Sequence, residues 1–190
     1  MELHHSKHHN TYVNSYNEAS EKLLTAEASD DVRAKIALQP LINFHGGGHI
    51  NHSLFWENLA PKSQGGGTPP SGSLATAIDD TYGSLEELKK KFNAALAGIQ
   101  GSGWAWLVKD TQTGNISIQT YANQDPVVGR YQPLLGVDAW EHAVSGERNI
   151  TREPMELTAI VLPSVPEPQS RILYRHLGCD QLEGGREEVR

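Results

Sequence analysis

Apolar and aromatic residues recur at loose helical spacing through the first part of the chain. Between residues 2 and 27 no proline or glycine interrupts the pattern, which predicts one helix. A second helical pattern covers residues 31–44, with Ser29 or Asp30 as its expected N-terminal cap. Two antiparallel helices are the simplest arrangement of these segments.

Two features of the second pattern leave its continuity open. Pro40 lies inside it and is expected to bend the helix, because proline removes a backbone donor and its ring crowds the preceding turn. The glycines at 46–48 permit either a break or a close approach of another backbone. An aromatic, helix-like pattern resumes at residues 49–59.

A stretch rich in glycine and proline divides the chain. We take residues 63–73 as a linker between a helical-hairpin domain at 1–62 and an α+β domain at 74–143. Residues 144–190 carry four of the ten prolines and end in a charged run with little apolar periodicity. We expect this divergent tail to be poorly structured.

Local signals in the α+β domain predict one helix and a small sheet. The sequence Ser-Leu-Glu-Glu at 84–87 resembles a capping box and predicts a helix that ends near Ala97. Strand patterns at 104–108, 115–121 and 132–138 predict three antiparallel strands. The expected fold class is α+β, with an N-terminal antiparallel helical hairpin followed by a domain with a three-stranded antiparallel sheet.

Composition narrows the classes of partner. The formal net charge of -7 argues against a nucleic acid or an anionic membrane surface, because no basic stripe is available to meet phosphates. No apolar run is long enough to span a membrane. The single cysteine, Cys179, cannot form an internal disulfide and fits a reducing compartment.

Three groups of side chains are candidate metal ligands. His4 and His8 lie one helical turn apart, His52 follows the glycine run among aromatic residues, and Asp138 ends a predicted strand with His142 one turn beyond it. Together they supply imidazoles and a carboxylate, which suit a redox-active first-row metal such as iron or manganese.

Each group also has an ordinary structural explanation. The first can be a surface histidine cluster, His52 a hydrogen-bonded core histidine and Asp138 a helix cap. Trp104 and Trp106 share one strand face, which is typical of core packing, and the sequence around Gln124 is typical of a turn. Because three independent coincidences would be needed, a catalytic metal is the leading hypothesis.

Five motifs along residues 1–143 carry a more specific signal. They are His-His-Ser-Lys-His-His-x-x-Tyr, Gly-Gly-Gly-His-Ile-Asn-His-Ser-x-Phe-Trp, Gly-Ser-Gly-Trp-x-Trp-Leu, Asn-Gln-Asp-Pro and Asp-x-Trp-Glu-His-Ala. In this order and approximate spacing they closely resemble the manganese and iron superoxide dismutase family. Within this family they resemble the eukaryotic mitochondrial manganese type.

The resemblance implies a site and a reaction. The four metal ligands it implies are His4, His52, Asp138 and His142. The surrounding shell it implies consists of His8, Tyr12, Phe44, Trp104, Gln124, Trp140 and Glu141. In this family the metal is alternately reduced and oxidised, so that superoxide becomes oxygen and hydrogen peroxide. A hydrogen-bonded chain through Gln124 to Tyr12 and His8 would deliver the protons.

The resemblance also implies the metal, the partners and the location. Manganese-type members carry an amide near the solvent ligand from the second half of the chain, as Gln124 does here. Iron-type members bring a glutamine from four residues before the second ligand, where this chain has Gly48. Manganese is therefore expected, with iron less so. Glu141 would bridge to a partner subunit, which implies a homodimer or homotetramer. The mitochondrial matrix is the implied location, with the cytoplasm as an alternative because no leader precedes His4.

The ends of the chain depart from the family. The family has a segment upstream of Met1, so we expect His4 at a frayed terminus, and it continues after Ala143 with closing helices. Val144-Ser145 can be encoded by a common intron donor, which favours a translated intron for the tail. Two alternatives stay open: an inactive or unstable truncated fragment that binds metal without turnover, and a metal-dependent hydrolase that activates water.

Overall fold

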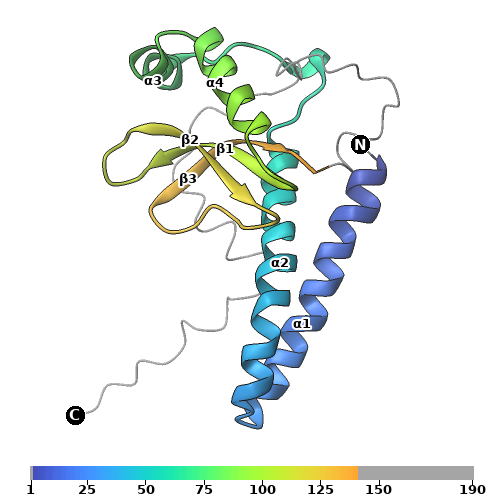
Figure 1. The fold of residues 1–190 in the computed structure, drawn as a ribbon. Coiled ribbons are helices and arrows are strands. Elements are labelled where there is room, and N and C mark those ends of the chain that lie inside the picture. The colour runs from blue at the N-terminus through green and yellow to red at the C-terminus, as the bar shows by residue number, and fades with distance from the viewer. Residues whose placement is uncertain (1, 141–190) are drawn as a thin grey trace, which may run out of the picture.

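The N-terminal part of the protein is an antiparallel helical hairpin, as the sequence predicts. In this computed structural model, which describes residues 2–140, a π-helical segment η1 (His4–His9) leads into α1 (Asn10–Ala28), and α2 (Val32–Glu57) returns beside it (Figure 1). Asp31 caps α2, since its Oδ1 accepts from the backbone N–H of Ala34 at 3.0 Å. The expected cap at Ser29 or Asp30 is therefore wrong, and Asp30 instead takes a positive φ of 51° in the turn.

Helix α2 is continuous through both features that left its continuity open. It contains Pro40 and runs on through the glycines at 46–48 without interruption. A break at the glycines is therefore the wrong alternative. All three glycines are buried. Gly47 and Gly48 face atoms too close for a Cβ, and a Cβ at Gly46 would make a tight contact of 3.1 Å with the Tyr16 ring. Close approach of other segments explains their presence.

Two further helices precede the sheet. After a 3₁₀ turn at Lys62–Gln64, α3 covers Gly72–Tyr82 and α4 covers Leu85–Ala97. The predicted helix start is confirmed, because Ser84 Oγ caps α4 and accepts from the backbone N–H of Glu87 at 3.2 Å. The sequence patterns did not identify α3, whose buried Leu74 and Ile78 are spaced one turn apart.

The three predicted strands form one antiparallel sheet, which confirms the fold class. They are β1 (Gly103–Asp110), β2 (Ile116–Ala122) and β3 (Tyr131–Asp138), in the order β2-β1-β3. In the central strand, Trp104 lies opposite Tyr121 on one side and Asp138 on the other. This register places Asp138, at the end of β3, beside Trp104, near the start of β1.

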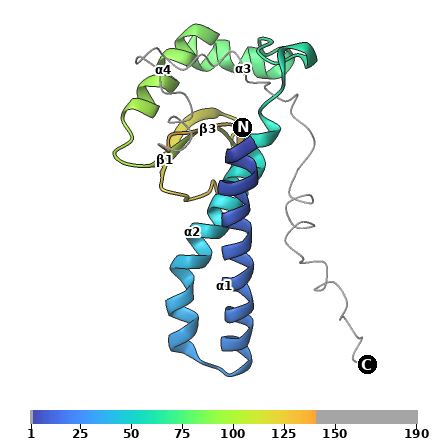
Figure 2. The same ribbon diagram turned by 90° about the vertical axis from the view of Figure 1, so that its right-hand side faces the viewer.

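The two faces of β1 contribute to different apolar clusters. Ala105 and Leu107 pack in a core with residues of α3 and α4, including Phe92. Trp104, Trp106 and Val108 point to the opposite face, where Leu54 and Phe55 of α2 cover them. Figures 1 and 2 show the sheet lying between α4 and the later half of α2, while the hairpin turn projects away.

Parts of the expected organisation lie outside residues 2–140. These are the tail at 144–190 and the two predicted site residues Glu141 and His142. Within the residues that are described, no helix combines the length and apolar character needed to cross a bilayer.

Candidate metal centre

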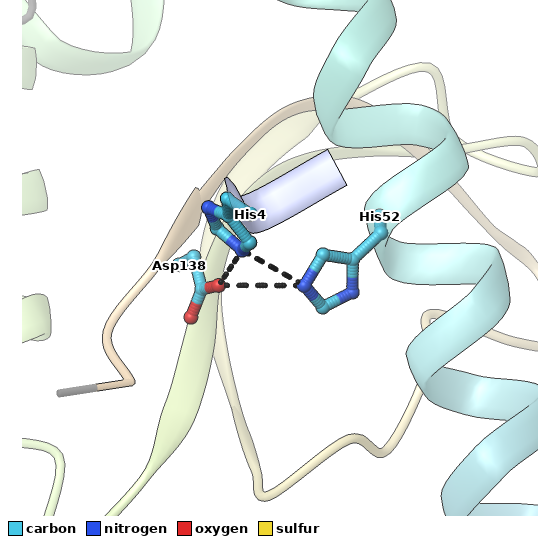
Figure 3. A group of neighbouring side chains, drawn as sticks. All are labelled: His4, His52 and Asp138. Atoms are coloured by element: carbon cyan, nitrogen blue, oxygen red, sulfur yellow. Dashed lines mark hydrogen bonds and ion pairs between the residues drawn. The ribbon is translucent and has the colours of Figure 1, made fainter. Parts of the chain in front are cut away.

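Three of the four predicted ligands converge from three separate elements. His4 comes from η1, His52 from α2 and Asp138 from the last position of β3 (Figure 3). The His4 and His52 Nε2 atoms are 3.0 Å apart, and Asp138 Oδ2 lies 3.3 Å from the first and 3.7 Å from the second. All three are buried, with exposed fractions of 8%, 0% and 2%. Among residues 2–140 this is the one group of three or more such side chains close enough to hold a metal ion together.

Backbone contacts orient His52 and Asp138 toward this point. Ring nitrogen Nδ1 of His52 lies 2.7 Å from the Gly48 carbonyl oxygen, so the Nδ1–H donates there and Nε2 keeps its lone pair. The backbone N–H of Trp140 donates to Asp138 Oδ1 at 2.9 Å, which leaves Oδ2 on the histidine side. Pairing with Trp104 of β1 fixes the position of Asp138 itself.

The charge state of the cluster suits a cation. Burial is the largest cause that lowers the pKa of His52 to about 4, with His4 and His9 adding to it and the Gly48 hydrogen bond and Asp138 opposing it. The ring is therefore neutral at neutral pH and offers an electron pair. Two ligands held about 2.0–2.2 Å from one ion are themselves about 3–3.5 Å apart, close to the separations found here. The donor set fits a first-row metal.

A directional hydrogen-bond chain runs beside the three side chains. The Trp104 indole N–H donates to Gln124 Oε1 at 3.0 Å, and Gln124 Nε2–H donates to Tyr12 Oη at 3.0 Å. Gln124 is completely buried. Burial, with Asp138 as a further cause, raises the pKa of Tyr12 to about 12, so the phenol keeps its proton at neutral pH.

Helix α2 holds the loop that carries Gln124. A Cβ at Gly47 would overlap the Gln124 carbonyl oxygen, so only glycine lets the loop come this close. One turn later the Asn51 side-chain N–H₂ donates to the same oxygen at 3.1 Å. Gly48 faces Tyr12, where an added Cβ would lie 2.6 Å from Cγ of the ring. The glycine run thus brings α1, α2 and the Gln124 loop together.

The remaining predicted site residues lie around this cluster. The His8 ring meets His4 edge-on at 5.9 Å between centroids, and Phe44 lies 5.9 Å from Tyr12 and 6.0 Å from Trp140. Trp140 also donates through its indole N–H to the Asn123 carbonyl oxygen at 3.1 Å. Glu141 and His142 lie outside the described residues.

Several residues near the site were not predicted. Asn51, Trp56 and His9 all contact predicted site residues or their supporting segments. Burial, followed by the neighbouring His49 and His5, lowers the pKa of His9 to about 4. The sequence signal for His9 was the histidine run itself, but helical spacing alone gave no reason to choose His9 over His5.

Comparison with known proteins identifies relatives of both halves. Residues 1–60 match the alpha-hairpin domain of iron/manganese superoxide dismutases, and residues 70–152 match their C-terminal domain. A protein of Zea mays named superoxide dismutase [Mn] 3.1, mitochondrial, is 55% identical over 146 residues, which cover 75% of this chain and 62% of the relative. The mitochondrial superoxide dismutases [Mn] of Schizosaccharomyces pombe and Saccharomyces cerevisiae are 58% and 56% identical, each over 75% of this chain and 64% of their own length. The chain thus spans less than two thirds of the length of these relatives.

Proposed function

The chain belongs to the iron/manganese superoxide dismutase family, and from this membership we propose that it converts superoxide to oxygen and hydrogen peroxide at a manganese centre. The observation that carries the proposal is the buried convergence of His4, His52 and Asp138. His142, outside the described residues, is the proposed fourth ligand. Two superoxide ions and two protons give one oxygen and one hydrogen peroxide, so the site must supply both electron transfer and protons.

Manganese is the proposed metal, with iron the less favoured choice. Gln124 reaches the site from the second half of the chain, and Gly48 has no side chain to offer an amide from α2. The relatives named above are manganese enzymes by name. A manganese ion held by His4, His52 and Asp138 would supply reversible one-electron chemistry.

The chain's own residues have separate roles in this proposal. Tyr12 holds a proton on Oη, because its raised pKa keeps the phenol neutral and the Gln124 N–H occupies its acceptor side. Trp104 fixes the orientation of Gln124 through the indole hydrogen bond. Phe44 borders this chain of hydrogen bonds at Tyr12, and His8 packs against the proposed ligand His4. Trp140 supports Asp138 through its backbone N–H.

The assembly and the location are also proposals. Glu141 is proposed to bridge to a partner subunit, which gives a homodimer or homotetramer. The mitochondrial matrix is the proposed location because the relatives are mitochondrial by name, and the cytoplasm is the alternative. The proposed division of the chain is a hairpin domain at 1–62 and an α+β domain at 74–143.

Metal analysis combined with a superoxide assay tests the function. The full chain is reconstituted with manganese and, in parallel, with iron, and both metal content and the rates of superoxide loss and peroxide release are measured. We expect activity with manganese. Asp138→Asn keeps the acceptor for Trp140 but removes the ligand charge, so it should lose metal and activity together. Asp110→Asn is the matched control at the far end of β1.

The outcomes separate the alternatives. Bound manganese without superoxide consumption would support the inactive-fragment alternative and contradict the proposed activity. Full activity with iron alone would contradict the choice of manganese. Metal-dependent hydrolysis without superoxide consumption would favour the hydrolase.

A further inference from the structure

A second group of hydrogen-bonded side chains lies beside His52 and includes His9. The Trp56 indole Nε1 lies 3.0 Å from His9 Nδ1, and His9 Nε2 lies 2.9 Å from His49 Nδ1. The His9 ring also stacks on the ring of His52, with 5.7 Å between centroids and 18° between planes. His9 belongs to η1, whereas its three partners all belong to α2.

The indole partner determines which nitrogen of His9 carries the proton. An indole N–H can only donate, so Nδ1 of His9 must accept and must have its lone pair free of hydrogen. A neutral imidazole then carries its hydrogen on Nε2, which donates to His49 Nδ1. The hydrogen bonds therefore run in one direction, from Trp56 through His9 to His49.

This direction argues against a second metal ion between the two rings. The spacing of 2.9 Å between His9 Nε2 and His49 Nδ1 resembles the 3.0 Å between the proposed ligands His4 and His52. A metal at His9 Nε2 would need the lone pair at that atom and the hydrogen on Nδ1. The Trp56 indole N–H occupies Nδ1, so a metal would have to displace it.

The same hydrogen bonds join η1 to α2 at the point where η1 presents His4. His4 lies at the first position of η1 and His9 at the last, so a shift of η1 along α2 would move both rings. Trp56 also meets the His4 ring edge-on at 5.1 Å, which links the two ends of η1 to one side chain. The two His9 hydrogen bonds therefore hold η1 against α2 near both His4 and His52.

We propose that His9 is a positioning residue for the metal centre: it joins η1 to α2 through hydrogen bonds of fixed direction and so sets the distance between His4 and His52. This role rests on the proposed function, because it concerns the same ligands. His9 does not reach the metal, and it acts through the placement of His4 and through the stacked ring of His52.

Two variants of His9 separate the hydrogen bonds from the ring. His9→Gln offers an oxygen to accept from Trp56 and an N–H₂ to donate to His49, but lacks the ring. His9→Phe keeps a ring to stack on His52 but has no hydrogen bond. His5→Gln is the matched control, since His5 is exposed, touches His9 and Trp56 only through ring contacts, and its side chain makes no hydrogen bond within residues 2–140.

Manganese affinity of the full chain, measured by competition with a chelator, is the first readout. We expect His9→Phe to weaken affinity by about 10–100-fold, the range for supporting residues of metal ligands. His9→Gln should recover most of the loss, and His5→Gln should match the unchanged chain. Equal affinity in the unchanged chain and His9→Phe would overturn the role of His9. Absence of manganese binding in the unchanged chain would instead overturn the proposed function, and the role of His9 with it.

Nitrogen-15 NMR of the histidine rings is the second readout and does not depend on activity. The His9 signals are assigned as those missing from His9→Gln, and the metal-free full chain is used. We expect the His9 ring to carry its hydrogen on Nε2 and none on Nδ1. This tautomer reports the hydrogen-bond partners of His9, so a purely structural role of the ring would not produce it. A hydrogen on Nδ1 would overturn the proposed direction of the hydrogen bonds. A His9→Gln variant that keeps its fold but binds manganese as weakly as His9→Phe would overturn the role of the hydrogen bonds.

Discussion

Gly47→Ala should destabilise the protein although alanine is the better helix former. Gly47 lies in the middle of α2, where an exposed glycine would be improved by alanine by about 1 kcal/mol. Here an added Cβ would overlap the Gln124 carbonyl oxygen and lie 3.0 Å from the carbonyl carbon and 3.1 Å from Cδ of Pro126. Ordinary carbon contacts are about 3.5–4.0 Å, so the loop must move away from the helix.

The magnitude follows from what this movement breaks. Forcing one extra carbon into a packed site costs about 1–3 kcal/mol. The shift also lengthens the 3.1 Å hydrogen bond from Asn51 to the Gln124 carbonyl, a bond worth about 1 kcal/mol. With the gain in helix propensity subtracted, we expect a net loss of about 1–3 kcal/mol. That loss is a sizeable share of the roughly 5–15 kcal/mol stability of a domain.

Urea unfolding of the metal-free full chain, followed by far-ultraviolet circular dichroism, measures this loss. Gly98→Ala is the control, because Gly98 ends α4 with an ordinary helical φ of -81°. Its Cβ would meet only the Ala94 and Ala95 carbonyl oxygens, at 3.4 and 3.5 Å. Gly98→Ala should be unchanged or slightly more stable. A Gly47→Ala protein as stable as the unchanged chain would refute the close-approach explanation.

Three other predictions test the core, the metal centre and a turn. Phe92→Ala removes a buried ring from the core beneath α4, so the free energy of unfolding, measured with urea, should fall by about 3–5 kcal/mol. Manganese at about 100 times its dissociation constant should stabilise the unchanged chain by about 2.7 kcal/mol, whereas Asp138→Asn should show no rise in thermal midpoint. The pKa of Asp110 lies below its ordinary value, chiefly because its carboxylate accepts from the backbone N–H of Gln112. A lowered folded-state pKa gives stability that is present above the unfolded value of about 3.8 and is lost as pH falls through the folded value. Asp110→Asn should therefore reduce the loss of stability at acid pH, and an unchanged acid slope would contradict this assignment.

Local signals accounted for those parts of the fold that are decided locally. The capping box at Ser84 placed the start of α4, because the cap hydrogen bond joins residues three positions apart. The strand patterns gave all three strands, since alternation reflects the two faces of each strand. The short helix α3 escaped detection because only Leu74 and Ile78 are buried within it, too few to establish a helical period.

Where a feature depends on distant contacts, the sequence offers the alternatives but does not decide between them. Whether the glycines at 46–48 break α2 or admit another segment depends on Gln124 and Tyr12, which approach from other elements. Gln124 lies in a sequence typical of any turn, and the Asn51 side chain that donates to its carbonyl oxygen is more than 70 positions earlier. Motif resemblance singled out Gln124 where periodicity could not.

The histidine run shows why spacing alone does not define this site. On an α-helix, His4 and His8 share a face and His9 points well away from it. The segment is instead π-helical, and the wider turn brings position i+5 closer to the face of position i. His9 can then contact α2 through Trp56 and His49 while His4, five positions earlier, meets His52. The site therefore depends on the one stretch of the hairpin whose backbone departs from the helical period, and its supporting residue could be recognised only once that departure was known.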